Sequence, residues 1–118
     1  MTREFVILKT FDKDWKSFGL TDNDLKDLEE FLCINPDYGD IIEGTGGLRK
    51  LRWKISGRGK SGGIRVIYID FLFYDKIFLI TAYKKNEQEN LTKSEKNQLK
   101  DLVKQLEQEL IRGKNYEK

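Results

Sequence analysis

Charged and apolar residues alternate between residues 48 and 55, which read LRKLRWKI, and this alternation restricts the fold more than any other feature. Successive side chains of a β-strand point to opposite faces. The segment is therefore expected to form a strand that buries its apolar residues. The opposite face of that strand would present a cationic row made of Lys50, Arg52 and Lys54.

Two further apolar segments, residues 63–73 and 76–83, extend the predicted sheet. The short turn Phe73–Lys76 between them predicts that they pair as an antiparallel hairpin. Residues 65–69 are apolar on both faces apart from Arg65, which predicts the central strand, with helices covering one side of it. A cation in such a strand is costly unless it lies at a strand end or in a cleft.

Helical patterns flank the strands on both sides. A short strand over residues 4–8 is expected to lead into a helix that ends at Gly19, and Thr21–Asp24 has the pattern of a capping box that begins a second helix. Another capping-box pattern, TKSE at residues 92–95, precedes a C-terminal helix that is expected to stop at Gly113. The predicted fold class is α+β: an N-terminal helical hairpin, a mostly antiparallel β-sheet and a C-terminal helix, in a single domain spanning residues 1–118.

Basic residues are concentrated in one part of the chain. Residues 44–69 contain seven Lys or Arg and no Asp or Glu, whereas residues 1–43 contain five basic and eleven acidic residues. A cationic strand surface suits a polyanion, and nucleic acid is the polyanion that a small cytosolic protein most often meets. No apolar run approaches the roughly 20 residues that span a bilayer. We therefore expect a soluble, cytoplasmic protein with no membrane partner.

The sequence contains few residues that could support catalysis by a metal ion or by a cysteine. It contains no His, and its single cysteine, Cys33, fits a packing role inside a helix. Acidic residues on the predicted strands are few, whereas a two-metal nuclease needs several converging carboxylates, so no metal and no cofactor are expected. The run Gly57–Ser61 ends like a phosphate-binding P-loop, but that motif requires glycine where Lys54 stands.

Lysine and arginine remain as candidates for chemistry on a phosphate. Arg52, Lys54 and Arg65 would converge if their two strands pair, and such a cluster can stabilise the extra charge of a pentavalent transition state. Crowded cations favour a neutral lysine, which suits Lys54 or Lys85 as a proton carrier. RNA supplies its own nucleophile in the 2′-hydroxyl, so this site suits RNA cleavage better than DNA hydrolysis. The pattern alone leaves three interpretations open: RNA cleavage, RNA binding without catalysis, and a plain solvated face.

An ordered set of short motifs lies between residues 35 and 87: NPDYGD at 35–40, GTGGLRK at 44–50, GKSGGIRVIY at 59–68 and YKKNE at 83–87. In this order they resemble the RelE/HigB-type toxins of bacterial type II toxin–antitoxin systems, within the RelE/ParE superfamily, and especially its phage-derived HigB-like branch. The resemblance implies the RelE-like microbial RNase toxin fold, whose order of elements agrees with the pattern of helices and strands above.

The resemblance also implies an activity, that of a metal-independent endoribonuclease. Such an mRNA interferase enters the ribosomal A site and cuts the translated message by attack of the 2′-hydroxyl on the adjacent phosphate. The catalytic positions of the family correspond to Arg52, Lys54, Arg65 and Lys85. Contacts to RNA or the ribosome are expected from Arg49, Lys50, Arg58, Lys60, Tyr83 and Lys84. Some relatives stack a tyrosine on the base; that position is Leu91 here, so Tyr83 or Tyr68 would have to replace it.

The implied partners are a cognate antitoxin with a helix-turn-helix DNA-binding region, the ribosome with its 16S rRNA, and mRNA. Contact with DNA would come only through the antitoxin. Two alternatives use the same scaffold: a ParE-like toxin that acts on DNA gyrase without nuclease activity, and a non-catalytic RNA-binding module.

Overall fold

The computed structural model describes residues 3–54, 63–84 and 90–116. Within these residues five strands form one sheet in the order β1-β5-β4-β3-β2, so β4 is the central strand, as predicted. β1 pairs with β5 in parallel, and the other pairs of this sheet are antiparallel. The strands are β1 (Glu4–Ile7), β2 (Asp40–Ile41), β3 (Arg49–Trp53), β4 (Ile64–Phe71) and β5 (Lys76–Lys84).

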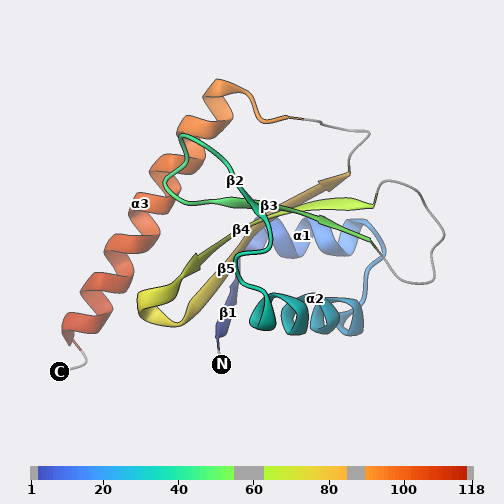
Figure 1. The fold of residues 1–118 in the computed structure, drawn as a ribbon, viewed down its shortest axis with the longest axis horizontal. Helices are drawn as coiled ribbons and strands as arrows, with labels where there is room; N and C mark the ends of the chain where they lie inside the picture. Colours follow the sequence, from blue (N-terminus) through green and yellow to red (C-terminus); the bar gives the residue numbers. More distant parts are fainter. Residues whose placement is uncertain (1–2, 55–62, 85–89, 117–118) are drawn as a thin grey trace.

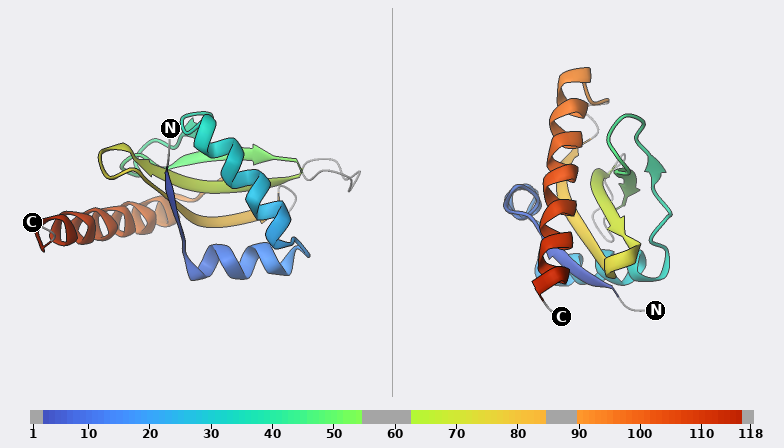
Figure 2. Two further views of the ribbon diagram at one scale, coloured as in Figure 1. Left: turned by 90° about the horizontal axis from the view of Figure 1, so that it is seen from below. Right: turned by 90° about the vertical axis from the view of Figure 1, so that its left-hand side faces the viewer.

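Helices cover both faces of this sheet (Figures 1 and 2). α1 (Lys9–Ser17) and α2 (Asp22–Ile34) lie against one face, and α3 (Lys93–Tyr116) lies against the other. The chain reverses between α1 and α2, which gives the predicted helical hairpin (Figure 2). Both faces of β4 are therefore covered, and the expectation of helices on one side only is wrong. None of the helices described is long and apolar enough to cross a membrane.

The capping box predicted before α2 is present. The backbone N–H of Thr21 donates to Asp24 Oδ2 at 2.8 Å, and the N–H of Asp24 donates to Thr21 Oγ1 at 3.2 Å. These two bonds satisfy N–H groups that have no partner inside the helix. At the start of α3 the N–H of Thr92 donates to Glu95 Oε1 and the N–H of Glu95 donates to Thr92 Oγ1. The sequence therefore predicts the beginnings of both helices correctly.

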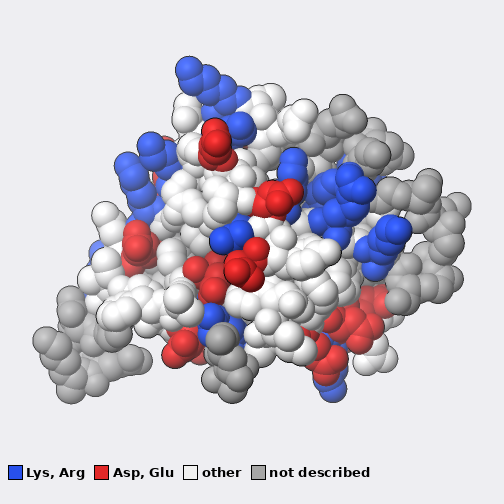
Figure 3. Space-filling view, viewed as in Figure 1, with Lys and Arg blue, Asp and Glu red and all other residues white. Residues whose placement is uncertain are grey.

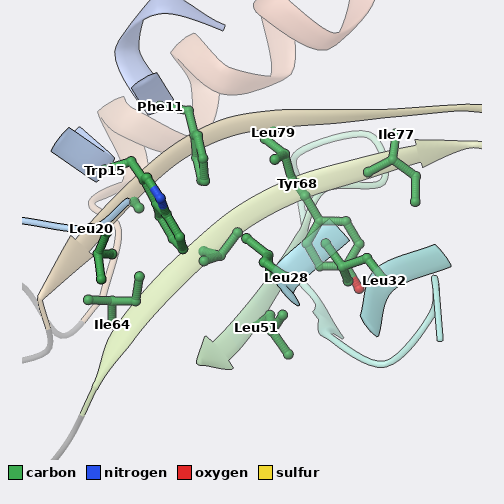
Figure 4. Packing of buried hydrophobic residues seen from close by; sticks show 12 residues of the cluster. Phe11, Trp15, Leu20, Leu28, Leu32, Leu51, Ile64, Tyr68, Ile77 and Leu79 are labelled. Carbon is green, nitrogen blue, oxygen red and sulfur yellow. The ribbon is translucent and has the colours of Figure 1, made fainter. Parts of the chain in front are cut away.

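The first hydrophobic core lies between the sheet and the pair α1–α2. In Figure 4 the side chains of both helices converge on β3, β4 and β5. Phe11 and Trp15 of α1 stack with their ring centroids 5.3 Å apart, and Leu28 and Leu32 of α2 are fully buried. The alternation of β3 is confirmed, because Leu51 is buried in this core and Trp53 packs against it.

The second hydrophobic core lies between the sheet and α3, and the glycine-rich segment before β3 helps to close it. Ile67 and Ile69 of β4 are buried there together with Val103 of α3. Thr45 has no exposed surface, and its Oγ1 donates to the Ile42 carbonyl at 2.6 Å. Gly46, at a φ of 81°, packs against Val103, since a Cβ built there would lie 3.5 Å from that side chain. The glycine-rich segment is thus a packing element beside α3.

A β-bulge in β5 is held by two polar residues of α1. The register passes from Ile67 opposite Thr81 to Tyr68 opposite Leu79, so Ile80 is the extra residue. Thr10 Oγ1 donates to the Ile80 carbonyl at 2.6 Å. Asp14 Oδ2 accepts from Thr81 Oγ1 at 2.7 Å and from the Ala82 N–H at 3.2 Å. α1 therefore bonds to backbone groups of β5 at this irregular part of the ladder.

Three details differ from the sequence-based expectations. β2 was not expected, because a strand of two residues has no periodicity to detect. The turn between β4 and β5 contains a 3-10 turn, Leu72–Tyr74, followed by Asp75 in the left-handed conformation at a φ of 53°. The expected stop at Gly113 is wrong, since α3 continues to Tyr116; no neighbouring atom lies within 4 Å of a Cβ built at Gly113.

Candidate functional site: a cationic row across β3, β4 and β5

Arg52, Arg65 and Tyr83 form a row across three neighbouring strands. Arg52 of β3 is directly opposite Arg65 of β4, and Arg65 is directly opposite Tyr83 of β5. Directly opposite residues of antiparallel strands project from the same face. That face is the one on which α3 packs, because Tyr83 contacts the second core. We call these residues the Arg52–Arg65–Tyr83 row.

Two lysines widen the row along β3. Lys50 and Lys54 are two positions before and after Arg52, so they project from the same face of the strand. Lys50 is half-buried and lies opposite Ile67, whereas Lys54 is exposed. In the space-filling view Lys and Arg side chains gather right of centre, over the end of β3 and the start of β4 (Figure 3). In both Figure 1 and Figure 2 α3 lies over the opposite end of the sheet.

Exposure differs along the row, and its middle member is the most buried. Arg52 is exposed, but Arg65 has only 8% of its surface exposed. Arg65 is the second residue of β4, which agrees with the expectation that this cation lies at a strand end. The Tyr83 hydroxyl is buried, and within the described part of the chain no hydrogen-bond partner reaches it. The row is thus exposed at β3, buried at Arg65 and partly buried at Tyr83.

Two charged groups influence the Tyr83 phenol. Burial raises the pKa of the Tyr83 phenol, the Arg65 guanidinium opposes that rise, and the Glu95 carboxylate adds to it. The Glu95 carboxylate of α3 therefore contributes to the electrostatics of Tyr83. The sequence predicted only its capping role, because the approach of α3 to the end of β5 depends on how the helix crosses the sheet. No signal in the linear sequence identifies Glu95 as a neighbour of this site.

Arg49 lies apart from the row, on the opposite face of β3. It is directly opposite Tyr68, whose side chain belongs to the first core. Arg49 Nη1 donates to the Asp37 carbonyl at 3.1 Å and to the Gly39 carbonyl at 2.7 Å. The Tyr68 hydroxyl accepts from the Gly39 N–H and donates to the Pro36 carbonyl, both at 2.9 Å. Arg49 and Tyr68 together hold the segment between α2 and β2.

The remaining basic residues predicted for the site are distributed differently. Lys84 lies on the α1 side, with its ammonium 5.4 Å from the centroid of the Phe18 ring. The structure therefore brings together Lys50, Arg52, Lys54, Arg65 and Tyr83 and leaves Arg49 and Lys84 elsewhere. Three predicted residues lie outside the described part of the chain: Arg58, Lys60 and Lys85.

Asp70 and Cys33 have positions that do not suggest a metal site or a nucleophile. Asp70 of β4 forms an ion pair with Arg3, whose Nε is 2.9 Å from Asp70 Oδ1 and whose side chain is only 2% exposed. Cys33 is half-buried in α2. Among the described residues no group of three or more Cys, Asp or Glu side chains is arranged to hold a metal ion.

The fold and the row define a class of protein: an α+β domain whose antiparallel strands present a cluster of arginine and lysine beside a C-terminal helix. The family model for the RelE toxin of the RelE/RelB toxin–antitoxin system matches residues 5–112. The chain therefore belongs to the RelE toxin family.

A solved structure of this family has a similar fold. A double arginine-to-alanine mutant of the E. coli toxin RelE, in the free state, superposes with a TM-score of 0.55 at 18% sequence identity. The alignment covers 75% of this chain and 90% of that chain. The likeness confirms the predicted α+β fold with its C-terminal helix.

Proposed function

We propose that this chain is a ribosome-dependent mRNA interferase, which cuts messages during translation in the cytoplasm. It is the toxin of a type II toxin–antitoxin pair, and we assign it to the HigB-like branch of its family. The observation that carries the proposal is the register of the row, in which Arg52 and Arg65 are cross-strand neighbours on one face. Two guanidinium groups that share a face are suited to bind the oxygens of one phosphate.

In the proposed reaction the 2′-oxygen of RNA attacks the adjacent phosphorus and the bond from phosphorus to the 5′-oxygen breaks. A base takes the proton of the 2′-hydroxyl, and an acid gives a proton to the departing 5′-oxygen. The products are a cyclic phosphate and a 5′-hydroxyl. Arg52 and Arg65 stabilise the charge that develops on the phosphate, because arginine keeps its proton. Lys54 and Lys85 are the proposed proton carriers, and no metal is required.

The proposed partners follow from the same assignment. Lys50, with Arg58 and Lys60, would bind ribosomal RNA or mRNA around the scissile phosphate. A cognate antitoxin with a helix-turn-helix region would neutralise the toxin and connect it to DNA. Arg49 and Lys84 lie on the opposite face of the sheet, so the proposal gives them no contact with the scissile phosphate.

Primer extension on an mRNA translated by purified ribosomes tests the proposal. The wild-type protein should produce cuts at defined positions of the translated message and none when ribosomes are omitted. The Arg65→Ala variant should produce no cuts, while its circular dichroism spectrum stays that of the wild type. Full activity of Arg65→Ala would remove Arg65 from the site.

The same preparation separates the two alternatives. A ParE-like toxin would leave the message intact and stimulate DNA cleavage by gyrase. A non-catalytic RNA-binding module would bind RNA with a strong dependence on salt and cut nothing. Either result would contradict the nuclease assignment.

A further inference from the structure

The Tyr83 hydroxyl is a buried polar group to which no described residue offers an acceptor or a donor. It has no hydrogen-bond partner among the described residues, and Tyr83 stands at the β5 end of the Arg52–Arg65–Tyr83 row. The other tyrosine of the sheet interior, Tyr68, shows the usual arrangement, since its hydroxyl both accepts and donates a hydrogen bond. Buried hydroxyls without partners are rare and point to a ligand or an ordered water.

The ring of Tyr83 is only partly available for stacking on a base. It is partly buried and packs against the second core. This packing leaves less of the ring open to a base. A contact of Tyr83 with RNA therefore involves its hydroxyl, on the residue directly opposite Arg65 in the register of the sheet.

We propose that the Tyr83 hydroxyl donates a hydrogen bond to a non-bridging oxygen of the RNA phosphate that Arg65 binds. This inference rests on the proposed function, because it assigns Tyr83 a contact in the same phosphate site. Arg65 supplies charge to the phosphate, and Tyr83 supplies a directed donor from the adjacent strand. The hydrogen bond forms as RNA enters and neighbouring side chains adjust, since catalytic hydrogen bonds commonly tighten only in the complex.

The electrostatic surroundings keep this donor protonated. Burial is the main cause that raises the pKa of the Tyr83 phenol, and the nearby Glu95 carboxylate raises it further. The opposing effect of Arg65 is smaller than that of burial. A neutral phenol at physiological pH can donate its proton to an anionic oxygen, whereas a phenolate would repel the phosphate.

The test compares Tyr83→Phe with Tyr68→Phe, because each variant removes one buried hydroxyl from the sheet. Single-turnover cleavage of mRNA on programmed ribosomes is measured at a temperature where both variants remain folded. We expect Tyr83→Phe to slow cleavage on the order of a hundredfold. Loss of one hydrogen-bond donor to the transition state typically has an effect of this size in other enzymes. Its affinity for ribosomes carrying mRNA with a 2′-deoxy nucleotide at the cut site should change little. Tyr68→Phe should lower the melting temperature and leave the cleavage rate near that of the wild type.

A sulfur substitution distinguishes a phosphate contact from a structural effect. Replacing one non-bridging oxygen of the scissile phosphate by sulfur weakens its hydrogen bonds. One of the two stereoisomers should therefore slow the wild type more than it slows Tyr83→Phe. Equal slowing by both stereoisomers in both proteins would overturn the inference.

The outcomes separate this inference from the proposed function. If Arg65→Ala abolishes cleavage but Tyr83→Phe cuts at the wild-type rate, the hydroxyl pairs only with water and the inference is wrong while the nuclease assignment stands. If the wild type cuts no translated message, the nuclease assignment fails and the inference fails with it.

Discussion

Single residues in this protein divide into those that hold the fold and those that face the site. Tyr68 and Arg49 belong to the first group, because together they bond to three backbone carbonyls and one N–H between α2 and β2. Arg52 comes three residues after Arg49 in the chain and is exposed on the other face of β3. The same residue type thus has two roles, and the strand's two-residue period decides which role each arginine takes.

The two buried tyrosines predict how stability depends on alkaline pH. Burial raises the pKa of both Tyr68 and Tyr83 above the ordinary value of 10.0. The unfolded chain therefore loses these protons first as the pH rises. Their contribution to the free energy of unfolding is complete below about pH 10 and declines above it.

We expect the free energy of unfolding to fall less steeply above pH 10 in Tyr68→Phe than in the wild type. Urea unfolding between about pH 8 and 11 measures this slope. The comparison removes the contribution of lysines, which titrate alike in the two proteins. Parallel pH profiles would contradict the assignment of the alkaline decline to Tyr68.

At the scale of elements, the pairing of β3 with β4 creates the site. Gly63, just before β4, allows this close approach. Its φ is 55°, and a Cβ built there would lie 2.3 Å from the Trp53 carbonyl oxygen. An L-residue would therefore have to adopt a left-handed backbone and move the end of β3 at the same time. The position of Arg52 opposite Arg65 depends on this glycine.

We expect Gly63→Ala to lower the free energy of unfolding by about 2–4 kcal/mol, from backbone strain and steric overlap together. Gly113→Ala is the matched control, since a Cβ there meets no atom within 4 Å. It should be neutral or stabilise α3 by about 0.5–1 kcal/mol. Chemical denaturation of the two variants measures both effects. If Gly63→Ala were as stable as Gly113→Ala, the close approach of Gly63 to Trp53 would not be needed for the pairing of β3 with β4.

At the scale of the whole molecule, one sheet separates two hydrophobic cores, and the charge follows this division. Acidic residues are concentrated in residues 1–43, which contain α1 and α2, and the basic segment forms β3 and the start of β4. The cationic face therefore lies on the side of α3, at the end of the sheet which that helix leaves open (Figures 1 and 3). A polyanion would approach this face and avoid the acidic pair of helices.

Much of this arrangement could be predicted from the sequence, because it depends on local patterns. Alternation predicts which side of β3 Lys50, Arg52 and Lys54 occupy, and the capping boxes predict the starts of α2 and α3. The meeting of Arg52 with Arg65 followed from the expected pairing of their strands.

Other features depend on contacts between distant parts of the chain, and these could not be predicted. Glu95 reaches Tyr83 only through the crossing of α3, and the bulge at Ile80 depends on Thr10 and Asp14 of α1. The parallel pairing of β1 with β5 is likewise set by tertiary packing, since β1 has only four residues.

The central claim is that the row on the α3 face, and not basic charge in general, cuts translated mRNA. Arg52→Ala and Arg49→Ala test it directly, because they remove the same charge from opposite faces of one strand. Cleavage is measured by primer extension on ribosomes at a temperature where both variants are folded. We expect Arg52→Ala to lose cutting at normal stability, and Arg49→Ala to lose about 1–2 kcal/mol of stability but retain cutting. Loss of cutting in Arg49→Ala with full activity in Arg52→Ala would contradict the claim.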